Sequence, residues 1–264
     1  MKLRCASLLV IFCALTASRA HASLIHSDVM GDTVWFTNIE ESSPTGDPLP
    51  LYGQPATNGD ELIFPTTGNF SANSLDGLGS DQTDGKLGMM IEAKAGFVLN
   101  SIFIEENGLV SLNGPFGGDA YAEVVGFAVV KIAEILNVPV NLPGFNVFFN
   151  VSPLSGQYQL STIGGSSFSS GWTGFGNIPL PENTTKVNVT LNNNLYAATL
   201  GSGTRAFLDK KAFEMDVVTE KIPDLIPEPA SGVLALAGGL LMLARVVRFE
   251  RANRVATVPM PPRR

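Results

Sequence analysis

The chain has 264 residues and a formal net charge of −7. Its acidic and basic side chains are unevenly spread, because residues 23–226 carry 22 acids and only eight bases, a net charge near −14. Nucleic-acid binding depends on a basic surface, so this composition argues against that class of function. The chain between the two ends, roughly 200 residues, is long enough for one all-β domain or two small ones.

The first 22 residues have the pattern of a secretory signal peptide. A positively charged start precedes an apolar region over residues 5–17, which is short for a membrane anchor. Ala20 and Ala22 then form a small-x-small cleavage site, which predicts Ser23 as the first residue left by signal peptidase. We therefore expect export through the Sec translocon, followed by cleavage.

Cleavage at this site removes both cysteines, Cys5 and Cys13. The mature chain then has neither a disulfide nor a catalytic thiol. One histidine, His26, remains close to the predicted N-terminus, where chains are usually mobile. Imidazole-based catalysis and histidine metal sites lack their residues, so we predict no enzyme activity, no metal and no cofactor.

A three-part pattern lies near the C-terminus. It begins with the tripeptide Pro227, Glu228 and Pro229, followed by an uncharged run over residues 230–244. Fifteen helical residues span only about 22 Å, and the two valines after Arg245 extend the membrane helix to about residues 230–247. The basic residues lie on one side only, which places the C-terminus in the cytoplasm and everything upstream outside. These residues are Arg245, Arg248, Arg251 and Arg254.

The order of these parts resembles the PEP-CTERM sorting signal of exosortase substrates, over residues 226–254. The resemblance implies a bacterium that makes extracellular polysaccharide and a membrane-embedded exosortase that recognises the tripeptide. It also implies transient anchoring in the inner membrane, then transfer to the cell surface or extracellular matrix. We assign residues 222–226 to a linker, residues 227–254 to the signal and residues 255–264 to a cytoplasmic tail, which is longer than the signal requires. An ordinary permanent anchor and a buried helix of a soluble domain are the alternatives.

The exported body, residues 23–221, reads as an antiparallel β-sandwich, which we expect to be jelly-roll-like. Alternation over residues 86–112 predicts three strands, with a hairpin at Asn107-Gly108. Residues 119–136 fit a helical stripe or a long strand, and their neighbours favour the strand. Other expected strands are 33–39, 61–64, 145–151, 157–163, 186–191, 195–200, 205–208 and 212–218. Residues 164–176 and the asparagines 192–194 are expected to form a loop and a turn.

Carboxylates are the remaining route to catalysis, as in glycoside hydrolysis. Two adjacent pairs are candidates, Glu40-Glu41 and Glu105-Glu106, but neighbours in a strand point to opposite faces, so neither pair forms a site alone. Asp76, Asp81 and Asp84 do not have the spacing of an EF-hand loop, and we interpret them as an ordinary acidic loop.

Trp172 lies in the Gly/Ser-rich stretch and is the best candidate for an exposed ring that contacts a glycan. The sequence thus favours an exported surface or matrix protein with a non-catalytic structural or adhesive role. A carbohydrate-binding module of the exopolysaccharide matrix is the first alternative, and a carboxylate-dependent glycosidase is the second.

Overall fold

The computed structural model describes residues 23–65, 67–115 and 118–222. The predicted signal peptide, the Pro-Glu-Pro tripeptide, the apolar run and the arginines after it lie outside these residues, so those assignments stay predictions. Within the described ranges, no helix is both long and apolar enough to cross a membrane.

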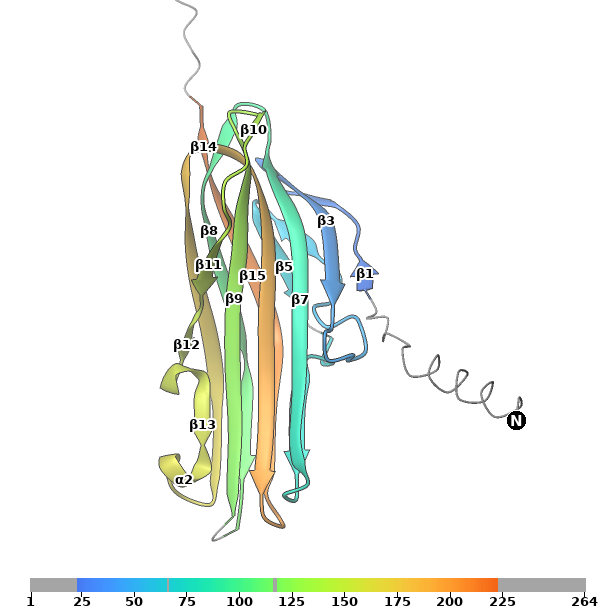
Figure 1. Ribbon diagram of the computed structural model, residues 1–264, viewed down its shortest axis with the longest axis vertical. Coiled ribbons are helices and arrows are strands. Elements are labelled where there is room, and N and C mark those ends of the chain that lie inside the picture. Colours follow the sequence, from blue (N-terminus) through green and yellow to red (C-terminus); the bar gives the residue numbers. More distant parts are fainter. Residues whose placement is uncertain (1–22, 66, 116–117, 223–264) are drawn as a thin grey trace, which may run out of the picture. The chain divides into compact units, whose positions relative to one another are not determined.

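The described strands are all antiparallel, and they form one hydrogen-bonded sheet that curls until its two halves face each other (Figure 1). This confirms the all-β antiparallel expectation. The long strands are β3 (Val34–Ser42), β7 (Gly79–Ala93), β8 (Phe97–Asn113), β9 (Asp119–Ile135), β14 (Ser167–Leu200) and β15 (Arg205–Lys221). The shorter elements are β1 (Ser23–Ile25), β2 (Val29–Met30), β4 (Ala56–Asn58), β5 (Glu61–Pro65), β6 (Ser71–Leu75), β10 (Val138–Pro139), β11 (Phe145–Phe148), β12 (Asn150–Ser152), η1 (Leu154–Gly156), β13 (Gln157–Gln159) and α2 (Leu160–Ile163).

Strand β14 joins the two halves, because its two parts pair with different neighbours. Its first part, residues 167–179, pairs with β8, and its second part, residues 184–200, lies between β7 and β9. The register shifts between Pro179 and Thr184, where two prolines that cannot donate to a ladder fall at the bend. Figure 1 shows β14 bending over one end of the domain and returning between β9 and β7.

The segment of β11 and β12 connects the two halves along one side. Strand β11 pairs with β9 in one half, and β12 pairs with the first part of β14 in the other. Between them, Phe149 donates its backbone N–H to the Gly126 carbonyl at 2.9 Å, and its side chain is 8% exposed. The ring of Phe149 therefore packs into the core between the two edges, where a Cβ added at Gly126 or Gly176 would meet it.

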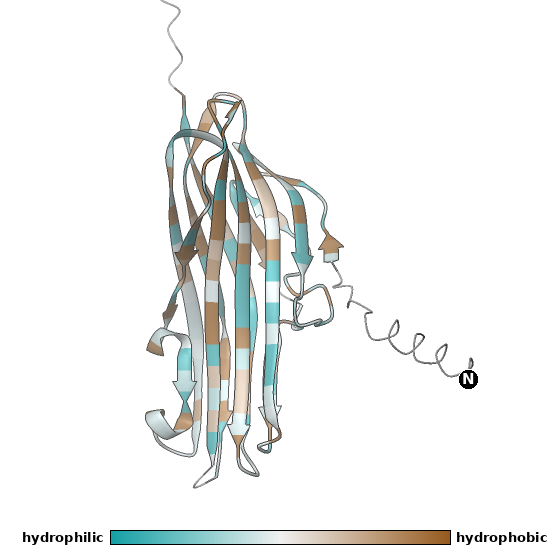
Figure 2. Cartoon of the chain, viewed as in Figure 1, coloured by the Kyte–Doolittle hydropathy of each residue, from teal (hydrophilic) through white to brown (hydrophobic). Residues whose placement is uncertain are grey.

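The core lies between the two halves and takes every second residue of the long strands. Along β8 the even-numbered residues from Ile102 to Leu112 are buried, and along β9 those from Ala120 to Ile132 are buried. Hydrophobic and hydrophilic bands follow one another along these strands in Figure 2. This period of two is what a strand with one buried face requires, and it confirms that residues 119–135 form a strand.

The hairpin predicted at Asn107-Gly108 is wrong, because both residues lie inside the continuous strand β8. Residues 86–112 therefore belong to two long strands, joined at Lys94–Gly96, and not to three. Gly108 is required for close packing: a Cβ there would lie 1.9 Å from the Asp209 carbonyl oxygen and 2.6 Å from the Trp172 ring.

The loop predicted over residues 164–176 and the turn predicted over residues 192–194 are also wrong. From Ser167 onward both segments lie inside β14, which has a hydrogen-bonded partner on each side through the asparagines. Asn193 faces the core at 1% exposure, whereas Asn192 and Asn194 are partly exposed. Two paired neighbours satisfy the backbone groups of this segment and override its local turn signal.

Replacing Gly108 with alanine is expected to destabilise the domain by about 3 kcal/mol, because the new methyl group would overlap a backbone oxygen and the indole ring. Urea denaturation measures this change. Gly88→Ala in β7 is the matched control, since its nearest neighbour, the Glu40 carbonyl oxygen, lies 3.9 Å from the added Cβ. Equal midpoints for the two variants would contradict the packing role of Gly108.

Candidate functional site

A shallow cleft of about 260 Å³ lies on the outer face of the half-sheet that contains β8 and β15. Its walls come from four adjacent strands, β14, β8, β15 and β5, which are distant in the sequence. We call it the acidic cleft, because four of its seven lining residues are carboxylates. The lining residues are Glu61, Phe103, Ile104, Glu105, Phe175, Glu214 and Asp216.

Strand pairing fixes the positions of these side chains, which form two rows across the strands. The phenyl rings stand at the β14 and β8 end of the rows, with ring centroids 6.3 Å apart and planes inclined by 32°. The Phe175 side chain is 45% exposed, so a ligand can reach its ring. In one row Phe175 lies opposite Glu105, which lies opposite Glu214; in the other Phe103 lies opposite Asp216, which lies opposite Glu61.

Burial and neighbouring carboxylates together change the proton affinity of Glu214 in the cleft. Partial burial raises the pKa of this carboxyl group above its ordinary value, and the negative charges of Glu61 and Glu105 raise it further. The cleft is therefore a concentrated set of hydrogen-bond acceptors beside two aromatic rings. Within the described residues, no group of three or more His, Cys, Asp or Glu side chains is arranged to hold a metal ion.

The expectation that Trp172 is an exposed ring is wrong. Its side chain is 1% exposed, and its indole N–H donates to the Asp209 carbonyl at 3.0 Å in the core. Trp172 therefore cannot contact a glycan in this conformation. The Gly/Ser-rich sequence around it suggested a loop, but the small residues lie in a strand whose buried positions alternate with exposed ones.

The two adjacent glutamate pairs are divided between opposite faces, as predicted. Glu40 and Glu105 are exposed, whereas Glu41 and Glu106 are fully buried. Glu41 accepts the backbone N–H groups of Leu51 and Tyr52 at 3.0 Å each, in a structural role. Glu105 belongs to the acidic cleft, and its partners there come from other strands. Sequence spacing gave no signal for that grouping, because strand pairing alone brings them together.

His26 is not at a mobile end of the chain, contrary to the expectation from its position. Its side chain is 3% exposed and packs edge-on against Phe64 with ring centroids 6.1 Å apart. Its backbone N–H donates to the Ile39 carbonyl at 2.8 Å, which extends the pairing of β1 with β3. The ring lies in the core, where its Nε2 is 3.6 Å from the Glu41 carboxylate.

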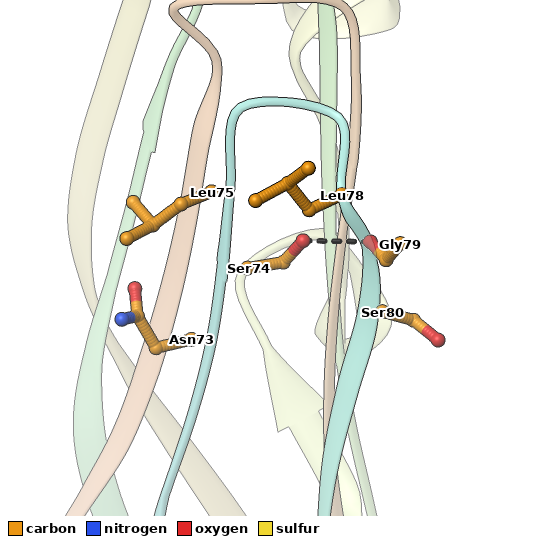
Figure 3. A pocket seen from close by; sticks show the side chains of 6 residues that line it. All are labelled: Asn73, Ser74, Leu75, Leu78, Gly79 and Ser80. Atoms are coloured by element: carbon orange, nitrogen blue, oxygen red, sulfur yellow. Dashed lines mark hydrogen bonds between the residues drawn. The ribbon is translucent and has the colours of Figure 1, made fainter.

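The aspartates of the Gly-rich segment have separate partners. Asp76 accepts the Gly203 N–H at 2.9 Å, and Asp81 accepts the Asn73 N–H at 2.7 Å. A second surface hollow, of about 240 Å³, lies at the nearby hairpin of β6 and β7 (Figure 3). The Ser74 hydroxyl donates to the Gly79 carbonyl there at 2.7 Å. No titratable side chain lines this hollow, so it does not provide acid–base chemistry.

Known proteins offer one distant structural likeness to this chain and no sequence match. No family model matches the sequence, and no curated protein matches it. Among solved structures, the carbohydrate-binding module TmCBM61, determined in complex with β-1,4-galactotriose, aligns with 70% of this chain and 89% of its own. The identity is 10% and the TM-score is 0.22, a likeness too low to carry an argument about fold or ligand.

Glu214→Gln is expected to raise the melting temperature at neutral pH by about 1–2 °C, because it removes one carboxylate from a crowded set. The pKa of Glu214 is raised in the folded protein, so the folded state holds its proton to a higher pH than the unfolded chain does. Stability of the native protein therefore falls as pH rises from the ordinary glutamate pKa through the raised one.

Thermal unfolding of both proteins at pH 7 and at acid pH measures the effect of Glu214. The difference should disappear at acid pH, where the native carboxyl group is already neutral. Glu182→Gln, at the exposed bend of β14, is the control and should change the melting temperature little at either pH. A lower melting temperature for Glu214→Gln than for the native protein at pH 7 would show that the Glu214 charge does not destabilise the fold.

Proposed function

We propose that this chain is an exported surface protein whose β domain binds carbohydrate without cleaving it. The acidic cleft is the observation that carries the proposal. Sugar hydroxyls donate hydrogen bonds to carboxylates, and hydrogen bonds to charged groups are stronger than those between neutral groups. The apolar faces of a sugar ring pack against aromatic rings, of which Phe175 is the exposed one here.

The form of the cleft favours an extended ligand over a small one. The two rows together cross four adjacent strands, so the lining side chains are spread across the sheet and not gathered around one point. The described lining includes four acids and no base, so it repels anionic polysaccharides. Neutral or amino-bearing polysaccharides are the class of ligand that this chemistry suits.

The terminal sequences supply the cellular context of the proposal. In this proposal the predicted signal peptide directs export of the domain. The C-terminal segment that resembles a PEP-CTERM signal is then recognised by an exosortase in a polysaccharide-producing bacterium. Pro227, Glu228 and Pro229 are the recognition element in this proposal, with Arg245, Arg248, Arg251 and Arg254 stopping translocation. An adhesive domain released into a polysaccharide matrix is consistent with carbohydrate binding.

A carboxylate-dependent glycosidase is the second candidate, and one observation favours it. A glycosidase needs one carboxyl group with a raised pKa as acid and a second carboxylate as nucleophile or base. Glu214 has the raised pKa, with Glu61 and Glu105 nearby. The two candidates differ in outcome, because only the glycosidase releases reducing ends and loses them in Glu214→Gln.

Phe175→Ala is expected to weaken binding to a neutral polysaccharide about tenfold, since it removes the exposed ring of the cleft. Affinity electrophoresis against a panel of neutral, amino-bearing and anionic polysaccharides measures the change. Phe148→Ala in β11 is the matched control, because Phe148 is 67% exposed but lies outside the cleft. Equal retardation of native protein and Phe175→Ala by every polysaccharide would exclude the cleft as the binding site.

Replacing Pro227-Glu228-Pro229 with three alanines is expected to leave membrane insertion intact and to block maturation. The apolar run and the arginines still hold the chain, but the exosortase loses its recognition element. Mass spectrometry of membrane and surface fractions from an exosortase-positive host would then show a full-length, membrane-retained species. The same mature mass for both proteins would leave the segment as a permanent anchor only.

A further inference from the structure

Four polar side chains from separate parts of the sequence meet in the core, between the two halves of the sheet. They are Glu106 from β8, Asn193 from the second part of β14, Lys210 from β15 and Tyr52 from the loop before β4, and we call them the buried cluster. Each of the four is 1% exposed or less. The cluster lies apart from the acidic cleft, which occupies the outer face.

The cluster brings an amine, a carboxamide and a carboxylate into mutual contact. The Lys210 Nζ lies 2.5 Å from Glu106 Oε2 and 2.7 Å from Asn193 Oδ1. The Asn193 Nδ2 donates to the same Glu106 oxygen at 2.8 Å. The Tyr52 hydroxyl donates to Asn193 Oδ1 at 2.8 Å, so the amide oxygen accepts hydrogen bonds from both the amine and the phenol.

Apolar groups exclude water from the cluster on both sides. The Lys210 Nζ lies 5.0 to 5.2 Å from the ring centroids of Tyr52, Phe70 and Phe213. On the other side Gly126 and Gly174 face Glu106, where an added Cβ would come within 2.9 Å of Glu106 Oε1. That oxygen is buried and has no hydrogen-bond partner among the described residues.

These surroundings favour the neutral form of the Lys210 amine. Burial lowers the pKa of the Lys210 amine, although the charge of Glu106 opposes the shift. A buried ion pair with one unpartnered carboxylate oxygen is costly, whereas proton transfer from the amine to the carboxylate leaves two neutral groups. The neutral amine is the nucleophilic form of lysine. Burial also raises the pKa of Tyr52, which keeps its hydroxyl as a hydrogen-bond donor.

We propose that Lys210 and Asn193 become joined by an intramolecular amide bond, an isopeptide bond, with Glu106 as the catalytic proton carrier. The geometry carries the proposal: nucleophile, electrophile and proton acceptor are in pairwise contact in a dry core. The modification does not depend on carbohydrate binding, because no residue of the acidic cleft takes part.

The reaction balances without an oxidant or cofactor. Glu106 takes a proton from the Lys210 ammonium, and the nitrogen lone pair attacks Cγ of Asn193. The carbonyl electrons move to Oδ1, where the Tyr52 hydroxyl stabilises the developing charge in the manner of an oxyanion hole. Glu106 gives the proton it carries to Nδ2 and takes one from the attacking nitrogen, the Cγ–Nδ2 bond breaks, and Nδ2 leaves as ammonia. The products are a neutral secondary amide, one molecule of ammonia and a protonated Glu106, which returns to its carboxylate form when it passes this last proton to the departing ammonia.

The bond would connect the second part of β14 to β15, which lie in opposite halves of the sheet. It would also end the unfavourable burial of the lysine charge, since an amide nitrogen has no charge. The two joined residues are 17 positions apart in the sequence. The link therefore closes a short loop and fixes the two halves covalently against each other.

Mass spectrometry of the purified full chain tests the proposal. The intact mass should be about 17 Da below the mass calculated from the sequence, the loss of one ammonia. This deficit should persist in denaturant, because an amide bond survives unfolding. Trypsin should not cleave after Lys210, and a branched peptide should appear that joins residues 187–205 to residues 206–211.

Glu106→Gln is the decisive variant, because it keeps the volume of the side chain and removes the proton acceptor. It should show the full calculated mass and normal cleavage after Lys210. Glu105→Gln is the matched control on the opposite face of the same strand, and it should keep the deficit. Should Glu106→Gln fail to fold, the double variant Glu106→Gln/Lys210→Met removes both buried charges and should fold without the cross-link.

Three outcomes would overturn the proposal. The first is a folded native chain with its full calculated mass and free cleavage after Lys210. The second is a deficit of about 17 Da without the branched peptide, which indicates an Asn succinimide and not a cross-link. The third is a Glu106→Gln protein that still contains the branched peptide, which would exclude Glu106 as the proton carrier.

Discussion

Burial of Glu106 and Lys210 between the two halves of the sheet is the constraint on which the domain depends. A charged group in a core is tolerated only when its partners are held in place, since removing one partner leaves an uncompensated charge. Asn193 and Tyr52 supply those partners from elements far away in the sequence. The cluster can therefore form only when β14 has bent and its second part has returned in the opposite half.

Strand β15 contains a local irregularity that allows Lys210 to face the core. Ala206, Leu208 and Lys210 face inward at even-numbered positions, and beyond an extra residue at 211 the inward positions are odd, beginning with Phe213. Such a bulge changes which side chains face the core. Asp209 stabilises this bulge. Its carboxylate accepts a hydrogen bond from the Leu109 N–H at 3.0 Å, and its backbone carbonyl accepts one from the Trp172 indole N–H.

Much of the fold could be predicted from alternation, but neither the cluster nor the cleft could. Residues 119–136 are expected to form a strand because their neighbours are strands, although a helical stripe also fits them, and the buried positions of the folded strand do alternate. The Asn-Gly pair in β8 and the three asparagines in β14 suggested turns, because local signals ignore strands that pair from elsewhere. Gly108 is present to admit the Trp172 ring, and Asn193 faces inward to meet Glu106. Those reasons lie in contacts between distant segments, which sequence spacing does not contain.

The inner cluster and the outer cleft are built on the same strands, which links the stability of the core to the proposed binding face. Glu105 and Glu106 are consecutive in β8: the first lines the cleft, and the second carries the hydrogen bonds of the cluster. A flat binding face needs its rows held in register, since a shift of one residue would turn every carboxylate inward. After the predicted cleavage the chain has no cysteine with which to form a disulfide. A covalent link from Lys210 to Asn193 would supply the missing restraint, because it would hold β15 against the second part of β14 in the opposite half while the outer face stays free for a ligand.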